Sequence, residues 1–236
     1  MRIITFPTAD AVIPYELTGQ TGLTLVIDAL RMTSVAIAAL GNGCARLCAV
    51  ETVEEARVLA PQYNALLGGE RNTVRIDGFE FGNSPSEYTT EKIAGRSLIV
   101  TTTNGTRAIA KANPTGEVWL AAFLNARAIA ERILSETFDN ITIICAGTLG
   151  RFTMEDALVA GAILIKLDGH DELDDFSLAC IELYQSSRDN LLEFISKTEH
   201  AKRLVRLGFS GDLEYCLRED VSNVIPKLNN SGWFTS

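Results

Sequence analysis

The chain has 236 residues, of which 47% are apolar and 22% are charged, and its formal net charge at pH 7 is −9. This length and composition are typical of a globular protein with a sizeable core, and no apolar run approaches the roughly 18–20 residues of a membrane span. The negative charge argues against nucleic-acid binding, which needs a basic face. An anionic small molecule can bind only where local arginines or a metal ion overcome the repulsion.

The N-terminal segment and the cysteines predict a cytoplasmic protein. Residues 1–8 lack the apolar core and the small-residue cleavage site of a signal peptide. Without an export signal, the five cysteines are expected to be reduced thiols, several of them in the core. Cys44 and Cys48 have no comparable second pair of ligands, so we expect no zinc site there.

Apolar runs and helical patterns alternate along most of the chain. Runs rich in β-branched residues predict strands at 23–27, 46–50, 65–67, 97–101, 118–121 and 141–145. Helical patterns follow most of them, at 32–40, 53–60, 106–112, 126–134 and 154–165, and Thr52 and Glu55 form a capping box before the second helix. This alternation predicts a three-layer α/β/α fold with a mixed, largely parallel sheet.

Two segments depart from this alternation. Residues 70–93 are expected to form an ordered loop because Gly78, Gly82, Asn83 and Pro85 interrupt the pattern. Beyond Leu167 the strand signal stops, and an acidic turn at 168–175 leads into helices that continue to about Val221. We therefore predict one compact unit over 1–236, with a possible division into an α/β core at 1–167 and a helical C-terminal part at 168–236.

The predicted strands end in unusually polar loops, at 28–34, 68–71, 101–107, 123–125 and 145–156. In open α/β sheets, ligands bind outside the carboxyl ends of the strands. Amides at helix starts, hydroxyls and arginines are what a phosphate or sulfonate requires. Carboxylates beside them would repel such an anion unless a hard cation such as Mg²⁺ lay between.

Each of these loops also has a purely structural interpretation. Asp28 can cap the helix that follows it, and Gly68 can simply permit a tight turn. Asn104 belongs to an ordinary turn, and Thr153 and Asp156 have the spacing of a helix cap in which Asp156 only satisfies a backbone amide. The structural interpretation is the more frequent one for each residue alone, but it explains less well why so many polar groups gather at one edge.

Two incompatible chemistries overlap in residues 145–156. Cys145 and Arg151 have five residues between them, which is the spacing of a thiolate phosphatase loop. Glu155 and Asp156 follow at once, and this acidic pair suits a divalent cation. Both carboxylates would raise the thiol pKa and repel a phosphate dianion, which favours the metal over the thiolate.

Five motifs in register resemble those of the 2-phosphosulfolactate phosphatase family: DALRMTS at 28–34, LGGER at 67–71, GFEFGNSPSEY at 78–88, TTTNGTR at 101–107 and CAGTLGRFTMED at 145–156. The likeness runs from about residue 23 to 165 and continues weakly into the tail. It implies a Mg²⁺-dependent hydrolase, with an α/β fold of its own and a homodimeric assembly, that converts 2-phospho-3-sulfolactate to 3-sulfolactate and phosphate. In methanogens this step belongs to coenzyme M biosynthesis. A related phosphorylated hydroxy acid is an alternative substrate.

The residues expected to carry this activity lie in the same loops. For the metal we expect Asp28, Glu70, Glu155 and Asp156. For catalysis we expect Asp28, Arg31, Glu70, Arg151 and Asp156, with Asp28 as metal ligand or nucleophile. For substrate binding we expect Thr33, Ser34, Arg71, Asn83, Ser84, Thr103, Asn104, Gly105, Thr106, Arg107, Asn125 and Gly147. Arginines at several loops fit a substrate with more than one anionic group.

Three other interpretations stay open at this point. A cysteine phosphatase would use Cys145 and Arg151, although Ile144 replaces the histidine usual before such a cysteine. A haloacid dehalogenase-type hydrolase would need a second aspartate two residues after Asp28, where Leu30 stands. A non-catalytic anion-binding protein would have no use for the carboxylates that accompany the arginines.

Overall fold

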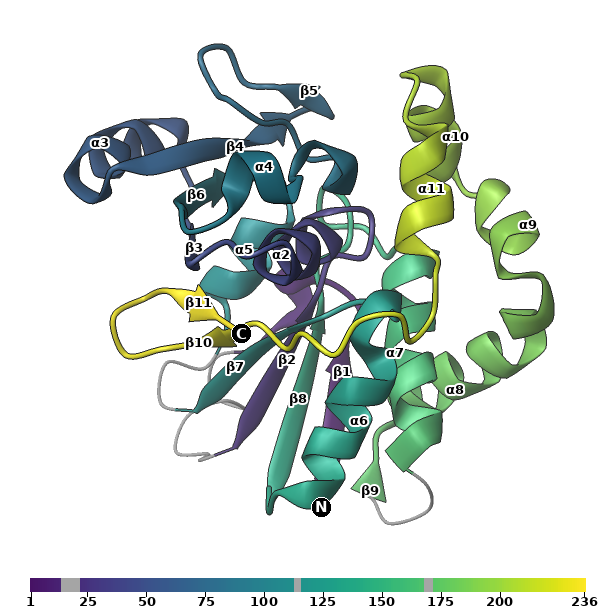
Figure 1. The fold of residues 1–236 in the computed structure, drawn as a ribbon. Helices are drawn as coiled ribbons and strands as arrows, with labels where there is room; N and C mark the ends of the chain where they lie inside the picture. The colour runs from purple at the N-terminus through teal and green to yellow at the C-terminus, as the bar shows by residue number, and fades with distance from the viewer. Residues whose placement is uncertain (14–21, 113–115, 168–171) are drawn as a thin grey trace.

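The computed structural model describes residues 1–13, 22–112, 116–167 and 172–236, and residues 168–171 of the predicted acidic turn lie outside them. Over these ranges the strands form a mixed, mostly parallel sheet of eleven strands, and helices cover both of its sides (Figure 1). The predicted three-layer α/β/α fold is therefore confirmed. No helix within the described ranges is both long enough and apolar enough to cross a membrane.

All six predicted strands are present, with ends that shift by a few residues. They are β2 (Leu23–Ile27), β3 (Arg46–Ala49), β4 (Ala65–Arg71), β6 (Ser97–Thr101), β7 (Glu117–Ala121) and β8 (Asn140–Cys145). Every residue of β2 is buried, as expected for a central strand covered on both faces. Leu25 and Ile27 pack toward one layer of helices, whereas Val26 packs toward the other.

The predicted helices are also present: α2 (Met32–Gly41), α3 (Val53–Tyr63), α5 (Gly105–Ala110), α6 (Ala126–Ser135) and α7 (Met154–Leu167). The side chain of Thr52 caps α3 by accepting a hydrogen bond from the Glu55 amide at 3.1 Å. The segment 70–93 is more regular than predicted, because it contains the short strand β5 (Val74–Arg75) and the helix α4 (Thr90–Ile93).

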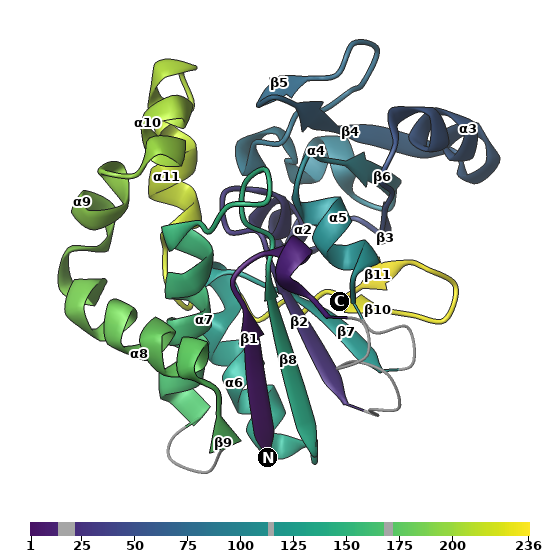
Figure 2. The ribbon, with the colours of Figure 1, turned by 180° about the vertical axis from the view of Figure 1, so that it is seen from behind.

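Several strands have no counterpart in the sequence pattern. The strand β1 (Arg2–Phe6) pairs in parallel with β8, and Figure 2 shows the two side by side. The others have two residues each: β9 (Glu172–Leu173), β10 (Lys227–Leu228) and β11 (Phe234–Thr235). The expectation that strands stop beyond Leu167 was therefore wrong, because segments this short form strands only through their tertiary partners.

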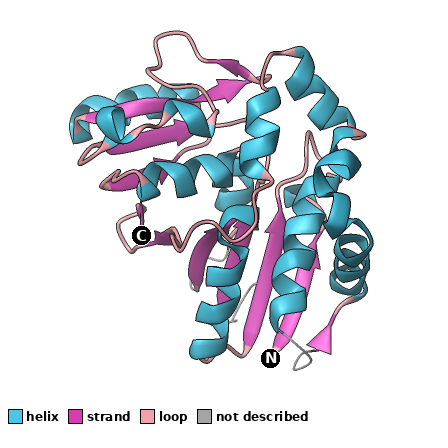
Figure 3. Cartoon of the chain, turned by 45° about the vertical axis from the view of Figure 1, so that its right-hand side comes forward, coloured by secondary structure: helices cyan, strands magenta, loops and turns pink. Residues whose placement is uncertain are grey.

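The sheet consists of two parallel sets joined by a hairpin. One set is β4–β6–β3, the other is β7–β2–β8–β1–β9, and the β10–β11 hairpin lies between them with antiparallel pairing on both sides. The strands of the two sets consequently run in different directions (Figure 3). The residues that follow β2, β4, β6 and β8 line one cavity, so the strand ends of both sets meet there.

The C-terminal part is helical, as predicted, and consists of α8 (Asp175–Ser187), α9 (Leu191–Ser196), α10 (Glu199–Arg206) and α11 (Ser210–Cys216). Helix α8 packs along α7, where a Cβ on Gly161 would lie 2.1 Å from the Cys180 carbonyl oxygen. Helices α10 and α11 stand beside the strand ends (Figure 1). The predicted single compact unit, and its possible division at residue 167, stay predictions.

Candidate active site

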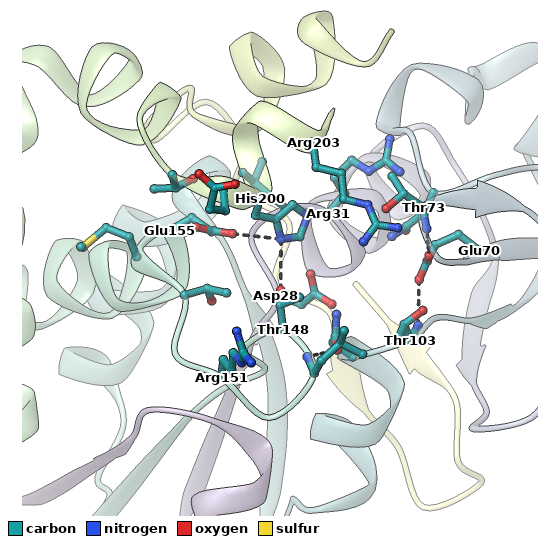
Figure 4. Close-up of a pocket in the computed structure, with 18 of the residues that line it drawn as sticks. Asp28, Arg31, Glu70, Thr73, Thr103, Thr148, Arg151, Glu155, His200 and Arg203 are labelled. Carbon is teal, nitrogen blue, oxygen red and sulfur yellow. Dashed lines mark hydrogen bonds and ion pairs between the residues drawn. The ribbon is translucent and has the colours of Figure 1, made fainter. Parts of the chain in front are cut away.

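A cavity of about 660 Å³ lies at the strand ends of both parallel sets. Its walls come from the loops after β2, β4, β6 and β8 and from one face of α10. Figure 4 shows Asp28 near its centre, with Glu155 and His200 on one side and Glu70 on the other. The strand-end loops singled out in the sequence therefore surround one space, and the C-terminal helices complete it.

Asp28 is the first residue after β2 and lines the cavity although it is only 7% exposed. Its Oδ1 accepts a hydrogen bond from the Met32 amide at 3.3 Å, while Thr33 closes the turn by donating to the Asp28 carbonyl at 2.9 Å. A Cβ on Gly105 would lie 2.5 Å from Oδ2 of Asp28, so only glycine allows α5 to approach this closely. Burial and the Asp156 carboxylate raise the Asp28 pKa to about 8.

Glu155 is 2% exposed and also lines the cavity. Its Oε1 lies 3.3 Å from Nδ1 of His200, and Nδ1 lies 3.1 Å from the Thr148 hydroxyl. The other carboxylate oxygen, Oε2, is buried and has no hydrogen-bond partner among the described residues. Burial and the charge of Asp156 raise the Glu155 pKa to about 8, whereas burial and the charge of Arg31 lower the His200 pKa to about 4.

Asp156 is buried behind the cavity wall rather than in it. Its Oδ1 accepts from the Ala29 amide at 2.9 Å, and its Oδ2 accepts from the Gly147 amide at 3.0 Å and the Thr153 hydroxyl at 2.8 Å. These bonds join the loop after β2 to the loop after β8. Burial nevertheless raises the Asp156 pKa to about 6, against the lowering effect of these donors.

Glu70 holds together the loops on the other side of the cavity. Its Oε1 accepts from the Thr103 amide at 2.8 Å, and its Oε2 accepts from the Thr73 amide. Both oxygens of Glu70 are thus oriented by backbone donors, as both oxygens of Asp156 are. Glu70 and Asp156 fix the positions of loops, whereas Asp28 and Glu155 keep oxygens available to a ligand.

The carboxylates around the cavity could hold a magnesium ion only together with other ligands. Within the described ranges, no three His, Cys, Asp or Glu side chains are grouped closely enough to hold a metal ion by themselves. Mg²⁺ does not require such a group, because it commonly binds one or two carboxylates and completes its shell with water and substrate phosphate. Asp28 and the unpaired Oε2 of Glu155 fit that pattern, since a buried unpaired carboxylate oxygen needs a cation or donor.

Arg31 reaches the cavity from a fully buried position, where it is 2% exposed. Its guanidinium forms an ion pair with Asp212 of α11 and lies 4.2 Å from the ring centre of Phe209. Asp212 is itself buried and accepts a second hydrogen bond from the Ser84 hydroxyl at 2.5 Å. Arg31 is therefore held by Asp212, a residue 181 positions away in the sequence.

The other three predicted arginines separate into two groups. Arg151 lines the cavity and forms no hydrogen bond through its guanidinium with any residue that the structure describes. Arg71 lies outside the cavity wall and donates to the Glu70 and Glu51 carbonyls and to the Thr101 hydroxyl. Arg107 is exposed and pairs with Asp10 at 2.6 Å.

The predicted polar residues also separate into lining and supporting groups. Those in the cavity wall are Asn83, Thr103 and Asn104, and the buried Thr103 hydroxyl has no partner in the part of the chain that the structure describes. Those that bond to their own loops or to neighbouring backbone are Thr33, Ser34, Thr106, Asn125 and Gly147. Ser84 supports Asp212, and Gly105 supplies the close approach to Asp28.

Sequence reasoning missed His200, Arg203 and Asp212. His200 and Arg203 are three positions apart on α10, so they share the face that looks into the cavity. Asp212 belongs to α11 and lies behind Arg31. In the sequence these residues resemble the solvated face of a surface helix, and only their tertiary position shows that they belong to the site.

The cysteine of the predicted thiolate loop is not in the cavity wall. Cys145 is the last residue of β8, is 1% exposed, and packs in the main core. Burial raises the pKa of its thiol well above the usual range, and the Asp156 charge adds to this effect. A protonated, buried thiol is a poor nucleophile.

The chain is similar to one family model and to several proteins that carry the same name. A family model described as 2-phosphosulpholactate phosphatase matches residues 11–231. Proteins of Thermotoga maritima and Caldanaerobacter subterraneus subsp. tengcongensis are 44% and 43% identical to this chain, over 207 and 211 residues, which cover 87% of the chain and 88% and 87% of the relatives. A protein of Caldicellulosiruptor saccharolyticus is 40% identical over 98% of each chain. All three are named "Probable 2-phosphosulfolactate phosphatase".

Proposed function

The chain belongs to the 2-phosphosulfolactate phosphatase family, and we propose that it is a Mg²⁺-dependent hydrolase that converts 2-phospho-3-sulfolactate to 3-sulfolactate and phosphate. The observation that supports this most directly is the composition of the cavity wall. It combines carboxylates that can hold a cation, Asp28 and Glu155, with arginines that can hold an anion, Arg31 and Arg151. A binding site for an anion alone would gain nothing from buried carboxyl groups, which would repel the anion whenever they are ionised.

Phosphoryl transfer depends mainly on positioning and on neutralising the negative charge of the phosphate. Asp28 and Glu155 would hold Mg²⁺, which supplies charge neutralisation at the phosphate oxygens when it is bound. Arg151 lines the same cavity and would contact the phosphate, and Arg31 is held by Asp212 in one orientation. Asp156 and Glu70 keep the four loops in register through backbone amides, so the reacting groups stay preorganised.

We expect hydrolysis of 2-phospho-3-sulfolactate to require Mg²⁺ and to survive alkylation of the thiols. EDTA should abolish phosphate release and added Mg²⁺ should restore it, whereas iodoacetamide should leave most of it. Four of the five cysteines are buried, and Cys48 is partly buried and outside the cavity wall. Phosphate release measured with molybdate tests this. Full activity in EDTA, together with its loss on alkylation, would support the cysteine mechanism instead.

Binding of the cation can be measured without turnover. A ligand that binds only the folded state at about 100 times its Kd adds about 2.7 kcal/mol to stability, so Mg²⁺ should raise the Tm of the wild type. Glu155→Gln should lose this gain, because its amide is a poorer ligand for a hard cation. Glu193→Gln, an exposed change on α9, is the control and should keep the gain. An equal rise in all three proteins would contradict a site at Glu155.

Cys145→Ser should leave kcat within about tenfold of the wild type, which corresponds to about 1.4 kcal/mol in the activation barrier. The reason is that Cys145 acts as a small apolar side chain in the core and does not face the cavity. Steady-state kinetics test this, with circular dichroism as the check that the fold is intact. A folded variant without activity would show that the thiol takes part in the reaction.

A further inference from the structure

Arg203 of α10 faces the cavity without an acidic partner. It is half-buried, and among the residues that the structure describes its guanidinium donates one hydrogen bond, at 2.8 Å, to the Asn72 carbonyl in the loop after β4. Within the described part of the chain it forms no ion pair. Since a guanidinium has five N–H donors, most of those of Arg203 are available to a ligand.

The other arginines near the cavity differ in how far their donors are already used. Arg31 already pairs with Asp212 through one of its nitrogens, while Arg71 and Arg107 are engaged by protein groups outside the wall. Arg151 and Arg203 are the lining arginines that have no acidic partner in the described ranges. Figure 4 shows them on either side of Asp28, Arg151 toward the loop after β8 and Arg203 toward the side of Glu70.

Helix α10 is held firmly enough to present Arg203 to a ligand. The Thr198 hydroxyl caps the helix by accepting from the Ala201 amide at 3.2 Å, and Ala201 and Leu204 are fully buried against the core. One turn before Arg203, His200 contacts Glu155 and Thr148. Helix α10 therefore contacts the side of the cavity where Glu155 lies, and it places the guanidinium of Arg203 toward the other side.

We propose that Arg203 forms a second anion subsite, which binds a carboxylate or sulfonate of the substrate while Arg151 binds the phosphate. This assignment rests on the proposed function, because it supposes a substrate with at least two anionic groups. In a protein of net charge −9, such a substrate needs a separate cation for each group. The C-terminal helices would then determine substrate choice, although the sequence motifs all precede them.

The subsite is tested by titrating 3-sulfolactate into the full chain with Mg²⁺ present, using isothermal calorimetry. Arg203→Met should raise the Kd by about tenfold or more, because a hydrogen bond to a charged group is lost. Arg206→Met removes the same charge from an exposed position on α10 that lies outside the cavity wall, and it should change the Kd little. Arg203→Lys should recover part of the affinity, since it restores the positive charge but not the planar set of donors of a guanidinium.

Two competitors identify which anion Arg203 contacts. Lactate lacks the sulfonate, and 2-hydroxypropane-1-sulfonate lacks the carboxylate. If the inhibition constant of lactate rises in Arg203→Met, Arg203 contacts the carboxylate. If that of 2-hydroxypropane-1-sulfonate rises, Arg203 contacts the sulfonate. In steady-state kinetics the same variant should mainly raise KM for 2-phospho-3-sulfolactate. For isopropyl phosphate, which has no second anion, KM should stay unchanged.

Failure of the subsite and failure of the proposed function give different results. An unchanged Kd and KM in Arg203→Met, or no binding of 3-sulfolactate by the wild type, would overturn the subsite while hydrolysis persists. Binding of 3-sulfolactate that depends on Arg203, without hydrolysis of any phosphate ester, would support the subsite and overturn the phosphatase. If both Arg203→Met and Arg206→Met weaken the binding of 3-sulfolactate equally, the effect comes from the net charge of the protein. That result would also overturn the subsite.

Discussion

Asp28→Asn should lower kcat for 2-phospho-3-sulfolactate by more than about 100-fold, which corresponds to about 2.7 kcal/mol in the activation barrier. The substitution keeps the size of the side chain and an oxygen that can accept from the Met32 amide, so the turn after β2 should survive. It removes the negative charge from the centre of the cavity. Whether Asp28 binds the metal or attacks phosphorus, an amide cannot replace it.

The competing interpretation is that Asp28 only caps α2. A lost helix cap costs about 1 kcal/mol of stability and leaves the chemistry intact. Asp174→Asn is the matched control, because Asp174 caps α8 by accepting from the Ser177 amide at 3.2 Å and lies outside the cavity wall. Rates are compared after thermal melts have shown both variants to be folded. A loss of less than tenfold in Asp28→Asn would assign this residue the structural role.

The fold could be predicted where the sequence pattern is local. The run from Leu23 to Ile27 is apolar throughout and β-branched in part, and the structure buries it as β2 with the predicted ends. β10 and β11 have two residues each, so no periodicity can be read from them. Their pairing with β7 and β3 is set by tertiary contacts, and it is this hairpin that joins the two parallel sets.

The candidate site could likewise be predicted only in part. Sequence position identifies the strand-end loops, but it does not give the direction of each side chain. Glu70 and Arg71 are adjacent in β4, and neighbouring side chains of a strand point to opposite faces. With Glu70 in the cavity wall, Arg71 points away from it and is engaged elsewhere.

The C-terminal contribution could not be predicted for a different reason. The helices α10 and α11 carry polar residues at helical spacing, which is also the pattern of any solvent-exposed helix. Arg203 and Asp212 acquire their roles only when these helices pack beside the strand ends. No residue spacing within the C-terminal segment distinguishes this arrangement from a helix that faces water.

Asp212→Asn should destabilise the protein by about 3–5 kcal/mol, because it leaves the Arg31 charge buried and unpaired. The two side chains are 2% and 6% exposed, so water cannot replace the lost carboxylate. The amide oxygen can still accept from the Ser84 hydroxyl, which limits the change to the pairing with Arg31. Urea denaturation measures the loss. Glu193→Gln, which breaks an exposed pair with Lys197, should cause little measurable change.

A double variant separates the stabilising role of this ion pair from its role in the reaction. Replacing both partners, in Arg31→Met with Asp212→Leu, removes the buried charges together and should recover much of the stability lost in Asp212→Asn. Activity should not recover, because Arg31 lines the cavity and its cation is gone. Urea midpoints and kcat are measured on the wild type, on Arg31→Met, on Asp212→Leu and on the double variant. If the double variant regains both stability and activity, Arg31 contributes only to folding and has no part in holding the substrate.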